Sequence, residues 1–221
     1  MDRRLARRFT VASLLLFFVM AFTDLLLLPA FSGSHLPRSG EVAIVFDGDT
    51  VMLRSGAKVR YLGIDSPEVA HDDQRGDCYG EEAKRYNRRL VLGKRVRLEY
   101  DREKRDHYGR LLAYVYLPDG RCVNEELIKK GYAFVLRRPE GFKKLYHFLQ
   151  LQRRAIQRRV GMWGYCRVDP EEFYIGNRRS FVFHRPSCPY GRQTARRNAI
   201  IFHSREEAFA EGFRPCRRCK P

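Results

Sequence analysis

The stretch Val42–Leu53, which reads VAIVFDGDTVML, decides the fold of this chain. Apolar residues alternate on both sides of a central Asp47-Gly48-Asp49. Alternation of this kind predicts two antiparallel strands, and a short segment of Asp and Gly between them predicts the turn of a β-hairpin. The sequence therefore predicts that the folded structure begins with a β-hairpin.

Further short strands and helices are predicted beyond the hairpin. Pro118-Asp119-Gly120 has the composition of a tight turn, and Gly93 is a suitable end for the helix before it. Asn124 is the expected N-cap of the next helix. The pattern predicts an α+β fold, a small five-stranded β-barrel with three helices. The remaining strands are expected over 58–64, 95–100 and 111–117, and the helices over 80–92, 124–131 and 142–160.

Three acidic residues and two arginines make the strongest chemical signal in the chain. Asp49, Asp65 and Glu68 supply carboxylates, which bind Ca²⁺ or Mg²⁺, and a spare carboxylate can take the proton of an attacking water. Arg60 and Arg110 supply guanidinium forks, which match phosphate oxygens. A metal-dependent enzyme that cuts a phosphodiester needs this set. The alternatives are an ordinary hairpin turn and arginines that are solvated surface charges.

Several spaced motifs give the segment 41–164 a family resemblance. They are DGDT at 47–50, R-x-x-x-I-D-S-P-E at 60–68, YGEEA at 79–83 and D-x-Y-G-R at 106–110. Their order and spacing resemble the thermonuclease (staphylococcal nuclease-like) family. The resemblance implies an OB-fold barrel, which suits nucleic acid, and a Ca²⁺-dependent nuclease activity.

The same resemblance implies roles for individual residues. Ca²⁺ is held by two carboxylates and a main-chain carbonyl, a general base activates water, and two arginines hold the phosphate. A tyrosine is expected to contact a terminal phosphate. Where the family carries paired tyrosines against the base, this chain has two arginines, which could stack on a base or hold a phosphate. These residues are Asp49, Asp65 and Ser66 for Ca²⁺, Glu68 as the base, Arg60 and Arg110 for the phosphate, Tyr108, and the pair Arg137 and Arg138.

A second metal site is predicted near the C-terminus. Cys216 and Cys219 form a C-x-x-C pair, and His184 with Cys188 supplies the other half of a tetrahedral zinc site. A disulfide between Cys216 and Cys219 and unpaired thiols are the alternatives, and His203 is a second candidate for the histidine ligand. A C-terminal module of about fifty residues has too small a hydrophobic core to fold without a bound zinc ion.

The segment 174–221 resembles the Ada-type metal-binding domain, a zinc module of a DNA repair protein. In that protein the first ligand is a cysteine that accepts a methyl group, whereas this chain has His184 there. Imidazole is a far poorer nucleophile than a zinc thiolate, so methyl transfer is not expected. The resemblance implies a structural or nucleic-acid-holding module of α+β type, stapled by Zn²⁺.

Charge and the N-terminal segment indicate partners and location. The chain of 221 residues has a formal net charge of +17 and a pI of about 10.0, which favours nucleic acid as partner, with anionic lipid as the other candidate. A basic head precedes an apolar run over 9–31, a pattern typical of an export signal. Secretion after cleavage and an uncleaved membrane anchor both stay open. Either way the folded part is expected outside the cytoplasm, as a monomer.

The expected domain order is a signal or anchor with linker over 1–40, the nuclease-like domain over 41–164, a linker over 165–173 and the zinc module over 174–221. The three remaining cysteines, Cys78, Cys122 and Cys166, predict one disulfide and one buried thiol, without choosing the pair. The function expected is an exported Ca²⁺-dependent nuclease for DNA, RNA or both. The alternative is a non-catalytic, extracytoplasmic nucleic-acid-binding protein.

Overall fold

A computed structural model describes residues 36–71 and 75–221. The expected export segment lies outside these residues. Residues Arg38–Pro221 form one compact unit. Within the described ranges, no helix has both the length and the apolar character that a membrane span requires.

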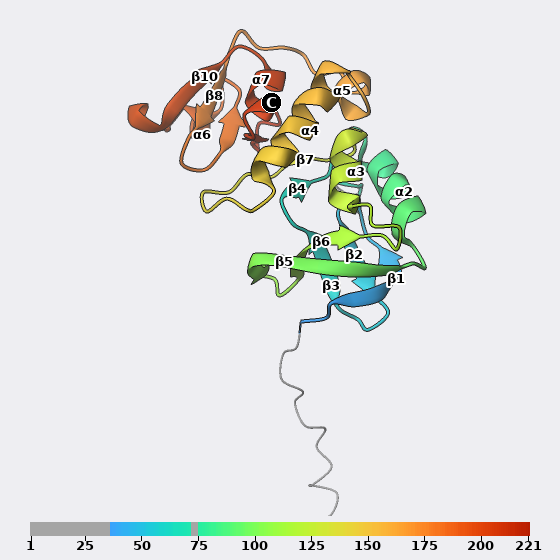
Figure 1. The fold of residues 1–221 in the computed structure, drawn as a ribbon. Helices are drawn as coiled ribbons and strands as arrows, with labels where there is room; N and C mark the ends of the chain where they lie inside the picture. The colour runs from blue at the N-terminus through green and yellow to red at the C-terminus, as the bar shows by residue number, and fades with distance from the viewer. Residues whose placement is uncertain (1–35, 72–74) are drawn as a thin grey trace, which may run out of the picture. The chain divides into compact units, whose positions relative to one another are not determined.

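Five strands close into a barrel in the order β1-β2-β3-β6-β5, which confirms the predicted α+β barrel fold (Figure 1). The predicted hairpin is present, with Val42 opposite Leu53 across β1 and β2. Val59 of β3 lies opposite Leu111 of β6 in a parallel pairing. The side chains of both pairs, Val42 with Leu53 and Val59 with Leu111, are buried in the core. The strands are β1 (Ser39–Val45), β2 (Thr50–Leu53), β3 (Lys58–Tyr61), β5 (Arg95–Arg105) and β6 (Leu111–Tyr116).

The strand expected over 58–64 is two strands separated by a turn. Gly63 has φ 77°, a left-handed conformation that glycine adopts without a steric penalty. After this turn β4 (Ile64–Asp65) leaves the barrel and pairs antiparallel with β7 (Phe134–Val135). Asp65 lies opposite Phe134 in this small sheet. The turn therefore moves Asp65 out of the barrel wall and fixes it by main-chain pairing.

The three predicted helices are confirmed as α2 (Gly80–Val91), α3 (Val123–Lys129) and α4 (Leu145–Gln157), and a short α5 (Met162–Tyr165) follows. The expected N-cap role of Asn124 is wrong, because Cys122, two residues earlier, occupies the N-cap and α3 begins at Val123. Asn124 is fully buried instead. Its Oδ1 accepts a hydrogen bond from Val115 N at 2.9 Å, and its Nδ2 donates to Leu62 O at 2.9 Å. It therefore joins α3 to the barrel.

The C-terminal part is a four-stranded sheet in the order β10-β8-β9-β11 with short helices. The N-terminus of α7 is capped, because Glu207 N donates to Ser204 Oγ at 3.0 Å and His203 N donates to Glu207 Oε2 at 2.7 Å. The elements are β8 (Tyr174–Asn177), β9 (Val182–His184), α6 (Pro189–Arg192), η2 (Arg196–Asn198), β10 (Ala199–Phe202), α7 (Arg205–Ala210) and β11 (Arg214–Pro215).

The barrel part and the C-terminal part share a hydrophobic core. Phe134 and Met162 pack in one buried cluster with Phe183 and Phe209. Gln152 of α4 is fully buried between the two parts, where its Oε1 accepts from Val135 N at 2.6 Å and its Nε2 donates to Phe209 O. Residues 38–221 therefore pack as one body, although the sequence alone gives no sign of this contact.

The disulfide that the sequence left open joins Cys78 to Cys166, and Cys122 is the buried free thiol. The prediction of one pair and one buried thiol is confirmed. The bond ties the loop before α2 to the segment that leads into the C-terminal part.

Candidate active site and metal centre

Two predicted carboxylates converge on one arginine at the mouth of the barrel. Thr50 lies opposite Arg60 in the pairing of β2 with β3, which brings the hairpin turn next to Arg60. The Arg60 guanidinium forms ion pairs with both Asp49 and Asp65. All three side chains are largely buried, and Asp49 is only 3% exposed. The structure therefore brings the hairpin turn and the end of β4 together around one arginine, as the predicted metal site requires.

The hairpin turn is held tightly against the segment that follows β4. Asp49 Oδ2 accepts a hydrogen bond from Ser66 N at 2.6 Å. A Cβ at Gly48 would lie 2.6 Å from the Cβ of Ser66 and 2.8 Å from that of Ala83, so only glycine fits this approach. Burial raises the pKa of the Asp47 carboxyl, and the charges of Arg60 and Arg110 oppose that rise. The turn is thus both an ordinary hairpin connection and an acidic centre.

Glu68 lies beside this centre with a more exposed side chain. Its main chain is fixed, because Glu68 O accepts from Asp77 N at 2.8 Å and Glu68 N donates to Asp77 Oδ2 at 3.3 Å. Burial raises the pKa of the Glu68 carboxyl, and the negative charge of Asp65 raises it further. A carboxylate with a raised pKa binds a proton more readily, which suits a general base.

Arg110 is held on a separate loop. Its Nε donates to Asp106 Oδ2 at 2.7 Å, and the N–H groups of Tyr108 and Arg110 donate to Asp106 Oδ1, each at 3.0 Å. Burial raises the pKa of the Asp106 carboxyl, but these hydrogen bonds outweigh it and hold the pKa below its usual value. Tyr108 is 74% exposed. Arg110 does not touch the Asp49–Arg60–Asp65 cluster, but its charge acts on Asp47.

The two arginines expected at the base-binding position have other partners. Arg137 lies over the Phe181 ring at 4.0 Å and donates to Glu211 O at 3.3 Å. Arg138 pairs with Glu103 at 2.8 Å. Neither forms a contact with the acidic centre, and their role in holding the substrate stays a prediction.

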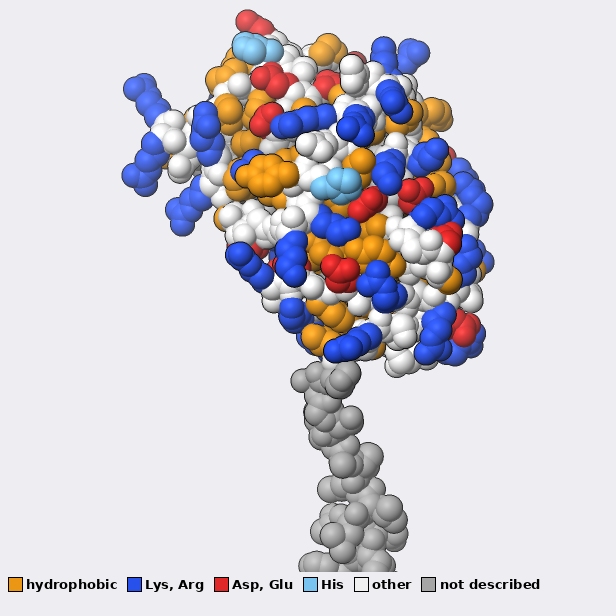
Figure 2. Space-filling model, in the orientation of Figure 1, with side chains coloured by type: hydrophobic (Ala, Val, Ile, Leu, Met, Phe, Trp, Pro, Cys, Tyr) orange, Lys and Arg blue, Asp and Glu red, His pale blue; other side chains and the backbone are white. Residues whose placement is uncertain are grey.

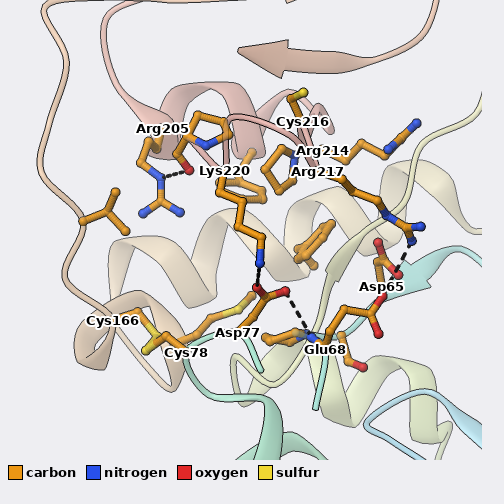
Figure 3. Close-up of a pocket in the computed structure, with 18 of the residues that line it drawn as sticks. Asp65, Glu68, Asp77, Cys78, Cys166, Arg205, Arg214, Cys216, Arg217 and Lys220 are labelled. Carbon is orange, nitrogen blue, oxygen red and sulfur yellow. Dashed lines mark hydrogen bonds and ion pairs between the residues drawn. A yellow bond between two sulfur atoms is a disulfide. The ribbon is translucent and has the colours of Figure 1, made fainter. Parts of the chain in front are cut away.

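Sequence reasoning missed the basic residues that the C-terminal part brings to the acidic centre. Arg217 lies 3.6 Å from Glu68 Oε1, and Lys220 Nζ lies 2.8 Å from Asp77 Oδ1 (Figure 3). No local pattern could have found these contacts, because they depend on how the shared core packs. Figure 2 shows Lys and Arg side chains distributed over much of the face in view.

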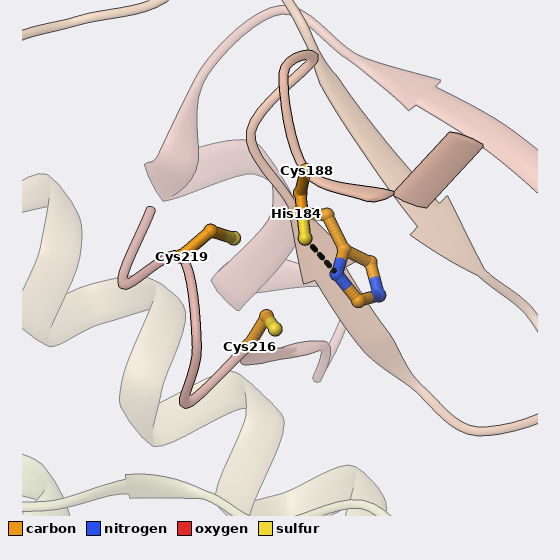
Figure 4. A group of neighbouring side chains, drawn as sticks. All are labelled: His184, Cys188, Cys216 and Cys219. Carbon is orange, nitrogen blue, oxygen red and sulfur yellow. Dashed lines mark hydrogen bonds between the residues drawn. The ribbon is translucent and has the colours of Figure 1, made fainter. Parts of the chain in front are cut away.

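The four predicted zinc ligands form one cluster (Figure 4). Their ligand atoms all lie within 4.8 Å of one another, and Cys188 Sγ lies 3.5 Å from His184 Nδ1. A tetrahedral ion with Zn–S bonds of about 2.3 Å separates its sulfurs by roughly 3.8 Å, so the cluster has a suitable size. Cys216 and Cys219 are free thiols, not the alternative disulfide.

The surroundings of the cluster favour the ligand forms of Cys188 and His184. Burial has the opposite effect on Cys219 and raises the pKa of its thiol to about 12. Burial raises the pKa of the Cys188 thiol, but the N–H groups of Gly191 and Tyr190 and the thiols of Cys219 and Cys216 outweigh it, so the pKa lies below its usual value. Burial and the charge of Arg214 lower the pKa of His184, which keeps the imidazole neutral. A thiolate and a neutral imidazole are the forms that bind zinc.

Two family models match the chain, one for each part. The model described as "Staphylococcal nuclease homologue" matches residues 58–165, and the model described as "Metal binding domain of Ada" matches residues 167–221. The thermonuclease of Staphylococcus intermedius is 36% identical over 122 residues, which are 54% of this chain and 72% of that protein. The chain belongs to the staphylococcal nuclease family.

Other members of the family are similar over shorter or comparable lengths. The thermonuclease of Staphylococcus hyicus is 34% identical over 56% of this chain and 74% of that protein. Endonuclease YncB of Bacillus subtilis is 46% identical over 40% of this chain and 44% of that protein. This chain is accordingly a nuclease-family hydrolase with an added domain similar to the metal-binding domain of Ada.

Proposed function

We propose that this member of the staphylococcal nuclease family is a Ca²⁺-dependent phosphodiesterase that cuts DNA, RNA or both outside the cytoplasm. The observation that carries the proposal is the convergence of Asp49 and Asp65 on one cation, the Arg60 guanidinium, with Glu68 beside them. A protein that only binds a polyanion has no use for buried acids in a basic surface, because they repel phosphate.

The residues present fit a bound Ca²⁺. Asp49 and Asp65 already share one positive group, which shows that their oxygens point to a common place that favours a cation. Asp49, Asp65 and the carbonyl of Ser66 would hold the ion, and hard oxygen donors are the set that Ca²⁺ prefers. When bound, Ca²⁺ supplies charge neutralisation of the phosphate and of the attacking oxygen.

The chain's own residues supply the rest of the reaction. Glu68 takes a proton from water, the water oxygen bonds to phosphorus, and the bond from phosphorus to the 5′-oxygen breaks. The 5′-oxygen takes up a proton from solvent, so the products are a 3′-phosphate end and a 5′-hydroxyl end. Arg60 and Arg110 donate guanidinium forks to the phosphate oxygens, where negative charge grows in the transition state. For this Arg60 exchanges a carboxylate partner for a phosphate, and Arg110 keeps its anchor on Asp106.

We further propose that His184, Cys188, Cys216 and Cys219 bind one structural Zn²⁺. The four side chains complete a tetrahedral shell, so no position is open for substrate. The zinc then supports the fold of the C-terminal part and does not take part in hydrolysis.

The disulfide supports the proposed location. Bonds such as Cys78–Cys166 persist mainly in oxidising compartments, outside the cytoplasm. Protease treatment of intact cells or spheroplasts tests the location. Digestion of the folded part, or its recovery from medium or periplasm, agrees with export, and a protected, soluble, full-length chain contradicts it.

The enzymatic proposal is tested by a plasmid-nicking assay with and without added Ca²⁺. Glu68→Gln is expected to lower the rate by roughly two to four decades, the range for a general base, while DNA binding is retained. Glu172→Gln, at an exposed glutamate, is the matched control and should cleave normally. Full activity of Glu68→Gln would overturn the role of Glu68 as the base, and cleavage that ignores Ca²⁺ would overturn the metal dependence. Absence of cleavage by the wild-type protein would leave the non-catalytic binding protein as the better account.

A further inference from the structure

A cavity of about 560 Å³ lies beside the acidic centre. Asp65 and Glu68 of the nuclease part line it, and Arg214, Arg217 and Lys220 line it from the C-terminal part (Figure 3). Its volume falls within the roughly 300–1,000 Å³ of pockets that hold small molecules. The cavity, which we call the composite cavity, can therefore take about one nucleotide unit next to the residues assigned to hydrolysis.

Positive charge is concentrated on the wall that the C-terminal part contributes. Arg214 is partly buried, Asp65 attracts it, and Arg217 is close enough to repel it. Arg217 pairs with Glu68 at 3.6 Å, but its side chain is 78% exposed and that of Glu68 is 58% exposed. Exposed ion pairs of this kind contribute little. Arg217 can therefore leave Glu68 for a phosphate at small cost.

The interior of the composite cavity is aromatic. Phe134, Trp163 and Phe209 line it, and the Trp163 and Phe134 rings pack edge-on to Phe209 with centroids 5.0 and 5.2 Å away. Aromatic side chains bind nucleobases by stacking without much regard to their identity, because every base has a π-face. Cations at the rim and aromatic rings inside match a phosphate joined to a base.

We propose that the composite cavity binds one unpaired nucleotide of the substrate strand, adjacent to the phosphodiester that is cut. The base lies against Trp163, and its phosphate is held by Arg214 and Arg217. This inference rests on the nuclease function proposed above and adds that the zinc-binding part forms half of the substrate site. A base that is stacked and paired in a duplex cannot enter such a cavity, so the site selects single-stranded or opened substrate.

The binding test uses Trp163, the single tryptophan of the chain, as its own reporter. The full-length, zinc-loaded protein is titrated with a thymidine tetranucleotide in buffer without Ca²⁺, and tryptophan fluorescence is followed. Saturable quenching is expected with the single strand and not with a blunt duplex. Arg217→Gln should weaken the single-strand affinity about tenfold, the scale of one charge-assisted hydrogen bond.

The matched control is Arg218→Gln. Arg218 is the next residue of the same C-x-x-C loop and does not line the composite cavity; it lies over the Tyr190 ring at 5.3 Å. Both variants lose one positive charge, so a general electrostatic effect lowers affinity equally in both. Zinc content measured in both variants shows that the loop is intact.

A kinetic measurement with Ca²⁺ separates this subsite from the nuclease function itself. For cleavage of a single-stranded oligonucleotide, Arg217→Gln should raise KM about tenfold and change kcat by less than about threefold, and Arg218→Gln should change neither. Absence of cleavage by the wild-type protein overturns the proposed nuclease function, while the quenching titration still decides the subsite. Absence of saturable quenching, quenching as strong with the duplex, or equal effects of Arg217→Gln and Arg218→Gln overturn the subsite.

Discussion

Gln152→Met is the perturbation that tests most sharply whether the barrel and the C-terminal part form one body. Gln152 is fully buried, its Oε1 accepts from Val135 N at 2.6 Å, and its Nε2 donates to Phe209 O. Methionine has nearly the same shape but cannot make either bond. The change therefore leaves one buried N–H and one buried carbonyl without partners, on opposite sides of the contact between the two parts.

The expected loss follows from those two groups. Each of the two unsatisfied buried polar groups costs about 1–3 kcal/mol, so the free energy of unfolding should fall by about 2–6 kcal/mol. For a chain of this size, 1 kcal/mol shifts Tm by roughly 2–4 °C, so Tm should fall by roughly 4–24 °C. Because the Gln152 side chain bonds to both parts, both parts should unfold in one transition, and the midpoint of that transition should be lower in the variant.

The assay is urea and thermal unfolding of the zinc-loaded protein, followed by tryptophan fluorescence and by circular dichroism. Gln150→Met, on the exposed side of the same helix, is the matched control and should change the free energy of unfolding by less than about 0.5 kcal/mol. The reasoning is refuted by a loss no larger than that of the control. A second contradicting result is that the wild-type protein unfolds in two separate transitions and that neither transition shifts in Gln152→Met.

Three further outcomes are expected. Arg110→Lys should lower kcat by roughly ten- to a hundredfold, because a point charge cannot replace a fork. Arg121→Lys, at an exposed position in the turn between β6 and α3, should cleave normally, and equal rates for both variants contradict the role of Arg110 in holding the phosphate. Cys216→Ser should abolish zinc binding in metal analysis and, through the shared core, lower oligonucleotide affinity, and retention of one zinc per chain rules out the assigned ligands. Gly48→Ala should destabilise the fold by about 1–3 kcal/mol and slow cleavage, because its Cβ meets Ser66; an unaltered melting curve would show that the turn can shift freely.

The local parts of this structure were predictable from the sequence because their signals are local. The alternation around Asp47-Gly48-Asp49 gave the hairpin, and the spacing of the C-x-x-C with His184 and Cys188 gave the metal cluster that the structure contains. Each of these depends on residues only a few positions apart or on ligand spacing that the chemistry restricts.

The long-range contacts were not predictable in this way. Asn is a residue type that often caps helices, but the side-chain amide of Asn124 bonds to Val115 of β6 and to Leu62 instead. The choice of Cys78 with Cys166, and the approach of Arg217 to Glu68, both follow from the packing of the C-terminal part against α4 and α5. No period or motif in a single sequence encodes such a surface match.

The most direct test of the central claim is the Ca²⁺ dependence of the cleavage rate. If Asp49 and Asp65 hold the ion, Asp65→Asn should raise the Ca²⁺ concentration for half-maximal cleavage by at least about tenfold, because one anionic ligand is lost. Asp169→Asn, at an exposed aspartate outside the cluster, should leave that concentration unchanged. The account predicts this separation between the two variants, and identical Ca²⁺ curves for Asp65→Asn and the wild-type protein would contradict it.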